Sequence, residues 1–143
     1  MDKLQLEALV RQVLMEKLGN PVSHGVRAVP VPQLRVTEAD RMDTGRPGDV
    51  VYTHDLFPLE QSPRLGAGLM EMHRTTFPWT LNYDEMDYII EGRLEILAGG
   101  ERISAGPGEV IYIPKGSTIQ FSAPEFARFL YFVYPADWQN QKT

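Results

Sequence analysis

The 143-residue sequence predicts an all-β fold, in which short strands form a sandwich or barrel, with one helix at the N-terminal end. Three observations lead to this prediction. Short runs rich in β-branched and aromatic residues recur after residue 35, and clusters of glycine and proline separate them. The 3.6-residue apolar period of a helix is confined to residues 1–20. Many short strands without a second helix are typical of one β-sandwich or β-barrel domain.

Residues 1–20 are predicted to form a short amphipathic helix. Apolar side chains recur at the spacings that place them on one stripe, at Leu6, Leu9, Val10, Val13 and Leu14. Gly19-Asn20-Pro21 is a strong signal for the end of a helix. An isolated helix of this length is marginal in water, so its apolar stripe needs a partner. That partner is the β domain, a second copy of the chain, or a groove on another protein.

The rest of the chain is predicted as a linker followed by one domain. Residues 21–35 are rich in proline and valine and have no clear period, as expected of a semi-extended linker. Residues 36–143 have the sequence pattern of a β domain, with short strand-like runs separated by glycine and proline. Its predicted strands lie at residues 49–52, 65–73, 79–92, 94–97, 109–114 and 127–134.

Composition narrows the classes of function. The net charge of -5 and a pI near 5.2 leave no basic stripe for phosphates, so we expect no nucleic-acid partner. No apolar run is long enough to cross a bilayer and no signal-peptide core follows Asp2-Lys3, so we expect no membrane partner. The chain has no cysteine, which excludes disulfides and thiolate zinc sites. A cytoplasmic protein is the expectation.

Residues 79–92 contain the most informative pattern. Glu85 and Asp87 precede the β-branched pair Ile89-Ile90, and Gly92 closes the run, as expected for a strand and a turn. Because side chains alternate along a strand, Glu85 and Asp87 should share one face, with carboxylates about 7 Å apart. Two acids in a partly dry interior repel each other. Either a cation offsets their charge, or one carboxyl has a raised pKa and can serve as a general acid or base.

This run and residues 106–119 resemble the two motifs of the cupin family, whose members are small β-barrels. Glu85 and Gly92 take the places of the Glu and Gly in the first motif. The second motif is matched at Gly108, Pro114 and Gly116. The resemblance implies one jelly-roll-like cupin barrel over residues 36–143.

The histidine metal centre of that family is not matched. The positions of its histidines fall on Trp79, Leu81 and Ile119, so no three-histidine, one-glutamate centre is expected. The histidines that the chain does contain, His24, His54 and His73, are scattered and are poor evidence for a metal site. Glu85 and Asp87 remain as possible oxygen ligands for Mg²⁺.

Several longer runs resemble the EutQ family, the cupins of ethanolamine-utilization operons. They are RMDTGRPGDVVYTHDLF at residues 41–57, SPRLG at 62–66, WTLNYDE at 79–85, IPKG at 113–116 and YPADW at 134–138. The resemblance covers about residues 36–138, and these runs are more specific than the general cupin motifs. EutQ proteins often have a longer N-terminal region, and here the helix and linker stand in its place.

The EutQ resemblance implies an activity and a setting. The activity is that of an acetate kinase, which converts ATP and acetate into ADP and acetyl phosphate, with Mg²⁺ as cofactor. The setting is the ethanolamine microcompartment of bacteria, with the protein as a homodimer. The N-terminal helix resembles an encapsulation peptide that would contact shell or cargo proteins through residues 4–18.

Two other functions are alternatives to acetate kinase. One is a non-catalytic or ligand-sensing cupin that organises microcompartment cargo through its helix. The other is a metal-dependent isomerase or dioxygenase. Because the chain has no P-loop sequence, a nucleotide site would have to lie inside the barrel or at its mouth.

The acetate kinase interpretation selects the candidate site residues. The catalytic candidates are Glu85, Asp87, Tyr83 and Lys115, of which the two acids are also the possible Mg²⁺ ligands. The candidates for substrate or nucleotide binding are Trp79, Tyr88, Arg93, Tyr112 and Tyr131.

Each candidate also has an ordinary structural explanation. Tyrosines and Trp79 commonly fill a β core, and the cations Lys115 and Arg93 are commonly solvated at turns. Glu85 could be a hydrogen-bonded remnant of the metal motif, and Asp87 could face outward after a bulge.

Overall fold

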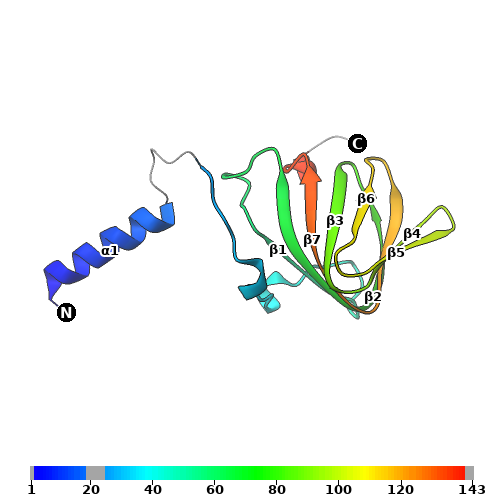
Figure 1. Ribbon diagram of the computed structural model, residues 1–143, viewed down its shortest axis with the longest axis horizontal. Coiled ribbons are helices and arrows are strands. Elements are labelled where there is room, and N and C mark those ends of the chain that lie inside the picture. The colour runs from blue at the N-terminus through cyan, green and yellow to red at the C-terminus, as the bar shows by residue number, and fades with distance from the viewer. Residues whose placement is uncertain (1, 19–24, 141–143) are drawn as a thin grey trace. The chain divides into compact units, whose positions relative to one another are not determined.

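The computed structural model describes residues 2–18 and 25–140, and the chain divides into two compact units (Figure 1). The first unit spans residues 1–30 and the second spans residues 31–143. His24 lies outside the described residues, as does the predicted helix-stop sequence at residues 19–21. Each unit is described separately below.

The first unit contains helix α1 (Lys3–Leu18), which confirms the predicted N-terminal helix. Asp2 caps it, because its Oδ1 accepts a hydrogen bond from the Gln5 amide at 2.8 Å while the Gln5 side chain accepts from the Asp2 amide at 3.0 Å. Leu6, Leu9 and Val10 are exposed. Within the described part of the chain, no helix is both long and apolar enough to cross a membrane.

The second unit contains seven strands in one continuous antiparallel sheet (Figure 1). They are β1 (Val50–Asp55), β2 (Gly66–Thr80), β3 (Asp84–Gly92), β4 (Leu94–Ala98), β5 (Glu101–Ala105), β6 (Val110–Ile113) and β7 (Thr118–Tyr134). Single 3₁₀ turns lie at η1 (Val31–Gln33), η2 (Glu38–Asp40) and η3 (Trp138–Asn140). The predicted all-β fold is therefore confirmed.

The two longest strands, β2 and β7, hold the fold together. They pair along almost their whole length, from Gly66 with Val133 to Thr80 with Thr118. Their register shifts beyond His73, where Arg74 has a positive φ of 45°, and such a bulge bends a strand pair. On one side of the bend the pair carries β1, β3 and β6, and on the other side it carries β4 and β5.

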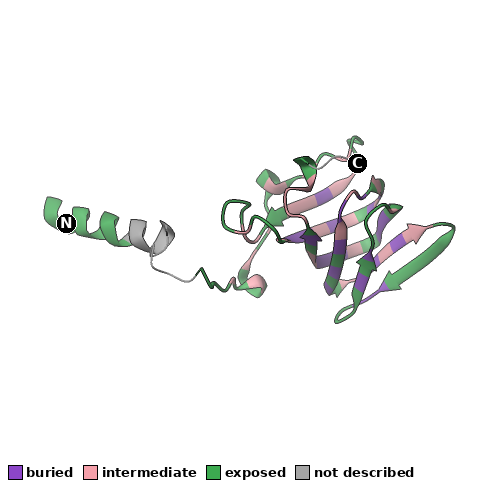
Figure 2. Ribbon diagram, turned by 90° about the horizontal axis from the view of Figure 1, so that it is seen from above, coloured by how far each residue is buried: buried purple, intermediate pink, exposed green. Residues whose placement is uncertain are grey.

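Both halves contribute to one hydrophobic core. Buried residues alternate with exposed ones along most strands, whereas β5 is exposed along most of its length (Figure 2). The core includes Val51, Met70, Ile89 and Phe129 from one half and Phe77, Ile96, Ile119 and Phe121 from the other. Each large apolar side chain buried in this way stabilises the fold by roughly 1.5–3 kcal/mol. The sheet is thus folded over on itself around its apolar face.

The strand predictions from sequence matched at least part of most strands but were wrong at residues 79–92 and missed residues 74–78 of β2. The run at residues 79–92 is not one strand, because residues 79–80 end β2 and a turn precedes β3 at Asp84. The sequence also did not predict β5 or residues 118–126 of β7. β5 buries too little to show an apolar alternation, and Pro124 interrupts the strand pattern of β7.

Residues 31–35, which the sequence assigned to the linker, belong to the β unit. Arg128 on β7 is 7% exposed and pairs with Glu71 on β2 at 2.5 Å. Arg128 Nη2 also donates to the main-chain oxygens of Val31 and Leu34, at 3.0 and 3.1 Å. A charge buried this deeply is stable only while its partners remain. The Arg128–Glu71 pair therefore anchors residues 31–34 to the β2–β7 pair.

Replacing Arg128 with methionine should destabilise the β unit strongly. Arg128→Met leaves the Glu71 carboxylate without its arginine and removes one of the two donors to each of the Val31 and Leu34 main-chain oxygens. Loss of one partner of a buried pair costs about 3–5 kcal/mol. Arg74→Met is the matched control, because it removes the exposed pair with Glu125 and should cost less than about 1 kcal/mol. Urea unfolding of the two variants measures the difference. Equal losses of stability would show that the buried pair anchors nothing.

Candidate functional site

Strand β3 carries both predicted acids into the interior. Side chains alternate along it, so Glu85 and Asp87 face the core while Met86 and Tyr88 face outward. Glu85 is 4% exposed and Asp87 is 0% exposed. The structure therefore places the two acids on the inner face, as the alternation predicted, and not outward as the alternative for Asp87 required.

The two carboxyl groups are poorly satisfied by the protein. Glu85 Oε2 and both oxygens of Asp87 have no hydrogen-bond partner within residues 2–18 and 25–140. Burial raises the pKa of Asp87 well above its usual value, and the charge of Glu85 raises it further. Burial also raises the pKa of Glu85, while Asp87 and Tyr83 favour its charged form. Of the two acids, Asp87 holds its proton more tightly, because it is completely buried beside Glu85.

Glu85 lines a pocket of about 500 Å³ inside the β unit, whereas Asp87 does not line it. The walls of the pocket come from strands β1, β2, β3 and β7. Its remaining lining residues belong to four connecting segments, at residues 42–43, 57–62, 83 and 136–140. This size is within the range of pockets that bind small molecules.

Aromatic side chains form one wall of the pocket. Trp79 at the end of β2 donates a hydrogen bond from Nε1 to the Tyr83 hydroxyl at 2.8 Å. Trp138 in η3 packs against both, with ring centroids 4.8 Å from Tyr83 and 5.9 Å from Trp79. Burial raises the pKa of Tyr83, and the nearby Glu85 charge adds to the rise, so its hydroxyl stays protonated. The wall therefore offers ring faces and a neutral phenol beside Glu85.

Tyr131 reaches across the sheet to a second acid of the pocket. Asp55, Gly68, Tyr131 and Asp87 are paired in one row across four strands. A Cβ at Gly68 would lie 2.0 Å from the Tyr131 ring, so only glycine leaves room for the ring to pass over the backbone. The Tyr131 hydroxyl then donates to Asp55 Oδ1 at 3.1 Å. Burial raises the pKa of Tyr131, and the charge of Asp55 raises it further.

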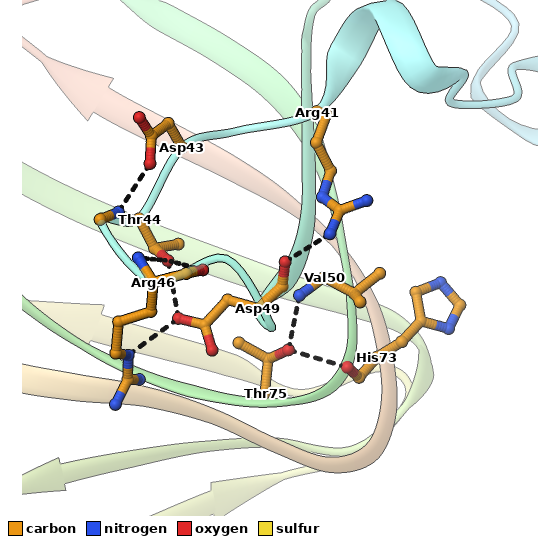
Figure 3. Close-up of polar contacts among 9 residues, drawn as sticks. Arg41, Asp43, Thr44, Arg46, Asp49, Val50, His73 and Thr75 are labelled. Carbon is orange, nitrogen blue, oxygen red and sulfur yellow. Dashed lines mark hydrogen bonds and ion pairs between the residues drawn. The ribbon is translucent and has the colours of Figure 1, made fainter.

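Asp43 reaches the pocket from the structured loop before β1 (Figure 3). Its Oδ1 accepts a hydrogen bond from the Gly45 amide at 2.8 Å. The carboxylate of Asp49 holds the loop together, because it accepts from Thr44 Oγ1 at 2.7 Å and from Arg46 Nε at 3.1 Å. The loop therefore presents Asp43 in a defined position.

The charge of the pocket lining has one sign. Four acids line it, Asp43, Asp55, Glu85 and Asp137, and no lysine, arginine or histidine of the described chain does so. Like charges in a partly buried site repel an anion and attract a cation. An anionic ligand could therefore enter this pocket only together with a bound cation that offsets its negative charge.

Four of the predicted site residues lie away from the pocket. Lys115 is exposed in the turn before β7, where its amide donates to Asp84 Oδ1 at 2.8 Å. Arg93 is exposed and donates to Ser104 Oγ at 2.6 Å. Tyr88 and Tyr112 are on the outer face, because they alternate with inward-facing neighbours on β3 and β6. The expectation that these four contribute to a site in the barrel is not supported by their positions.

The outer face that carries Tyr88 and Tyr112 is unusually apolar. Its exposed side chains are Met86, Tyr88, Val110, Tyr112, Phe132 and Tyr134, on the neighbouring strands β3, β6 and β7. Patches of this kind commonly mark contact surfaces. The homodimer implied by the resemblance stays a prediction, and this is the face on which a second copy would cover most exposed apolar side chains.

The described residues contain no group of three or more histidines and acids placed to hold a metal ion. His54 pairs with Asp40 at 3.0 Å, and His73 lies 3.7 Å from Glu71, both outside the pocket lining. For Mg²⁺, Glu85 fits as a ligand through its free Oε2, but Asp87 does not face the space where the waters of a hydrated ion would lie. A chelate by both acids is therefore not what the structure shows.

Several pocket residues were missed by sequence reasoning. Asp43, Asp55, Asp137 and Trp138 line the pocket but were not chosen as site residues. All four lie in the runs on which the EutQ resemblance rests, at residues 41–57 and 134–138. The specificity of those runs was the signal that could have found them.

Comparison with known proteins agrees with the predicted family and the predicted fold. The model of the family described as ethanolamine utilisation protein EutQ matches residues 1–140. The chain belongs to the EutQ family. A protein of Clostridioides difficile named Acetate kinase EutQ is 54% identical over 98% of this chain and 96% of its own length. A Salmonella typhimurium protein of the same name is 44% identical over 70% of this chain, but that region is only 43% of its own length.

Solved structures of EutQ proteins have the same fold. The Clostridium difficile EutQ structure has a TM-score of 0.81 and 58% identity, over 86% of this chain and 90% of that one. A cupin domain of a transcriptional regulator from Enterobacter cloacae has a TM-score of 0.53 at 14% identity, over 59% of this chain and 95% of that one. At that identity the likeness concerns the fold alone, and it supports the cupin barrel expected for this EutQ chain.

The pH dependence of stability should reveal the proton on Asp87. Its pKa in the folded state is raised above the ordinary 3.8, so its contribution to stability is complete below that pH and is lost as the pH rises. Relative to Asp87→Asn, the free energy of unfolding of the native protein should therefore fall above about pH 4, by at most about 1.4 kcal/mol per pH unit. Urea unfolding between pH 4 and pH 8 measures this difference. Glu125→Gln, an exposed loss of charge, is the control, and parallel curves for Asp87→Asn and the native protein would contradict a raised pKa.

Proposed function

We propose that this chain is an acetate kinase of the EutQ family and that its active site is the pocket lined by Glu85. The observation that carries the proposal is its 54% identity, over nearly its whole length, with a protein named Acetate kinase EutQ. The pocket also has a size suited to small-molecule ligands, and the buried acid Glu85 lines it.

The reaction sets clear demands on the site. A carboxylate oxygen of acetate attacks the γ-phosphorus of ATP, a new P–O bond forms, and the bond to the oxygen of ADP breaks. Acetate is already deprotonated at neutral pH, so the reaction needs no general base. What remains is to position two anions in line and to offset their charge. The Glu85–Asp87 pair is thus better suited to electrostatic work than to the acid-base role predicted for it.

The acidic lining makes the activity dependent on Mg²⁺ in this proposal. Among the described lining residues ATP would face four acids and no lysine, arginine or histidine, so its phosphates need a metal ion to enter. Mg²⁺ commonly binds through one or two carboxylates, its own waters and substrate phosphates, and Glu85 can supply such a carboxylate. When bound, the ion would neutralise charge on the transferring phosphoryl group.

Acetyl phosphate formation by the purified protein tests the proposal. Activity should require both ATP and Mg²⁺, and Glu85→Gln should lower kcat/KM by about tenfold or more because it removes the free carboxylate. Lys115→Ala should change kcat/KM by less than about twofold, since Lys115 lies outside the pocket. Trapping acetyl phosphate with hydroxylamine provides the measurement. A native protein without activity, or an unaffected Glu85→Gln variant, would remove the pocket as a kinase site.

A ligand-sensing cupin is the second candidate function. It is favoured by the absence of any lysine or arginine among the described lining residues, because kinase sites normally use such cations on the phosphates. A binding protein has no phosphoryl group to stabilise, so an acidic pocket is no obstacle to it. The kinase assay separates the two candidates.

We also propose that α1 directs the chain to a bacterial microcompartment. Asp2 caps the start of the helix, and the described leucines of the helix are exposed. A segment that docks into a groove requires such exposed apolar side chains. Residues 1–20 fused to a fluorescent protein should form foci in cells that make shells. Leu6→Glu with Leu9→Glu should disperse the foci, because two charges then lie in the apolar contact. Gln5→Glu with Gln12→Glu is the control, because it adds the same two negative charges outside the apolar stripe, and foci that persist in the leucine variant would argue against this docking mode.

A further inference from the structure

We propose that the pocket binds a small organic cation, a primary alkylammonium ion, with Glu85 as its counter-ion. This inference goes beyond the kinase activity and does not depend on it. It concerns a ligand that the pocket takes by itself, without nucleotide.

The first step is the sign of the charge. Asp43, Asp55, Glu85 and Asp137 reach the pocket from four different parts of the chain, and among the residues that the structure describes no basic side chain joins them there. Local partners fix the position of Asp43, which accepts from the Gly45 amide, and of Asp55, which accepts from the Tyr131 hydroxyl. The result is a concave site with a negative potential, which concentrates cations.

The second step is the unpaired oxygen. Glu85 lines the pocket and is 4% exposed, yet its Oε2 has no hydrogen-bond partner in the described chain. A buried acceptor without a donor costs about 1–3 kcal/mol or more when it is charged. An ammonium group has three N–H donors and a positive charge, so at the pocket wall it would pair with the Glu85 carboxylate and offset its charge.

The third step is the aromatic wall beside Glu85. The rings of Trp79 and Trp138 are nearly perpendicular, at 76°, and Tyr83 packs against Trp138. Rings set at an angle offer more than one face to a bound cation, and tryptophan is the best aromatic partner for cations. Tyr83 is also fixed by the hydrogen bond from Trp79. These rings would also pack against the alkyl part of the ligand.

The fourth step is size. A volume of about 500 Å³ is far more than one metal ion occupies, and it suits an organic molecule of several atoms. Mg²⁺ also keeps most of its waters and gains nothing from aromatic rings. An organic ammonium ion uses the acids, the rings and the volume together.

Intrinsic fluorescence gives a direct test, because the chain has only two tryptophans and both line the pocket. The probe is ethanolamine, which is protonated at neutral pH, and its neutral isostere is ethylene glycol. At constant ionic strength, ethanolamine should change the fluorescence in a saturable way, with an affinity at least about tenfold higher than that of ethylene glycol. Sodium chloride should produce no saturable change.

Variants show whether Glu85 is the counter-ion. Glu85→Gln should weaken ethanolamine binding by at least about tenfold, whereas Glu125→Gln, which removes an exposed charge at the protein surface, should leave it unchanged. Circular dichroism checks that each variant is folded. If Glu85→Gln does not fold, Asp43→Asn replaces it, since asparagine can still accept from the Gly45 amide, and a loss of about twofold or more is then expected.

Several results would overturn the proposal. They are a titration with ethanolamine that does not saturate, equal affinity for ethylene glycol, or unchanged binding in the Glu85 variant. The titration contains no ATP and the kinase assay contains no amine, so the failure of one proposal is distinguishable from the failure of the other.

Discussion

Two adjacent inward-facing acids on β3 are the constraint around which the pocket is built. Strand alternation puts Glu85 and Asp87 on the same face as Ile89, in a core where an unpaired charge is costly. The molecule limits this cost in two ways. Asp87 keeps its proton, because burial and the charge of Glu85 raise its pKa. Glu85 borders the pocket, where a ligand can supply the donor that the protein does not.

The pocket exists because β2 and β7 belong to both halves of the sheet. The bend beyond His73 folds the sheet so that Trp79 in one half lies at the same pocket as Glu85 and Tyr131 in the other. The shape of the pocket wall also depends on a single glycine. Gly68 leaves room for Tyr131 to reach Asp55, so the absence of one Cβ determines which hydroxyl lies at that wall.

The chemistry of the pocket limits how an acetate kinase could work here. Phosphoryl transfer concentrates negative charge, and kinases usually meet it with lysine, arginine and metal ions. This pocket has carboxylates, phenols and indoles at its walls, and the predicted cations Lys115 and Arg93 lie elsewhere. Acetate kinase activity, as the names of the relatives suggest, is compatible with the acidic lining if metal ions offset the negative charge of the phosphates. The same lining also suits a cationic ligand, which needs no such help.

Local patterns in the sequence were enough to predict the strand around Glu85, the shared face of the two acids, the N-terminal helix and the cupin barrel. Alternation and helical period are properties of neighbouring residues, and the motif glycines and prolines mark turns that depend on local backbone geometry. Alternation alone places Tyr88 on the face opposite Glu85 and Asp87, whereas for Tyr112 only the register of β6 against β3 shows that it points outward.

The tertiary structure alone decided which distant side chains share the pocket. Asp43, Asp55, Asp137 and Trp138 are far apart in the chain, and no local period connects them to Glu85. They meet because of the pairing of β1, β2 and β7 and the bend of two long strands, both of which depend on contacts between residues remote in sequence. The sequence by itself determined the strands and the inward acids, since these follow from neighbours. The one-sided charge of the pocket and the position of Asp87 beside it followed only from the packing of the whole domain.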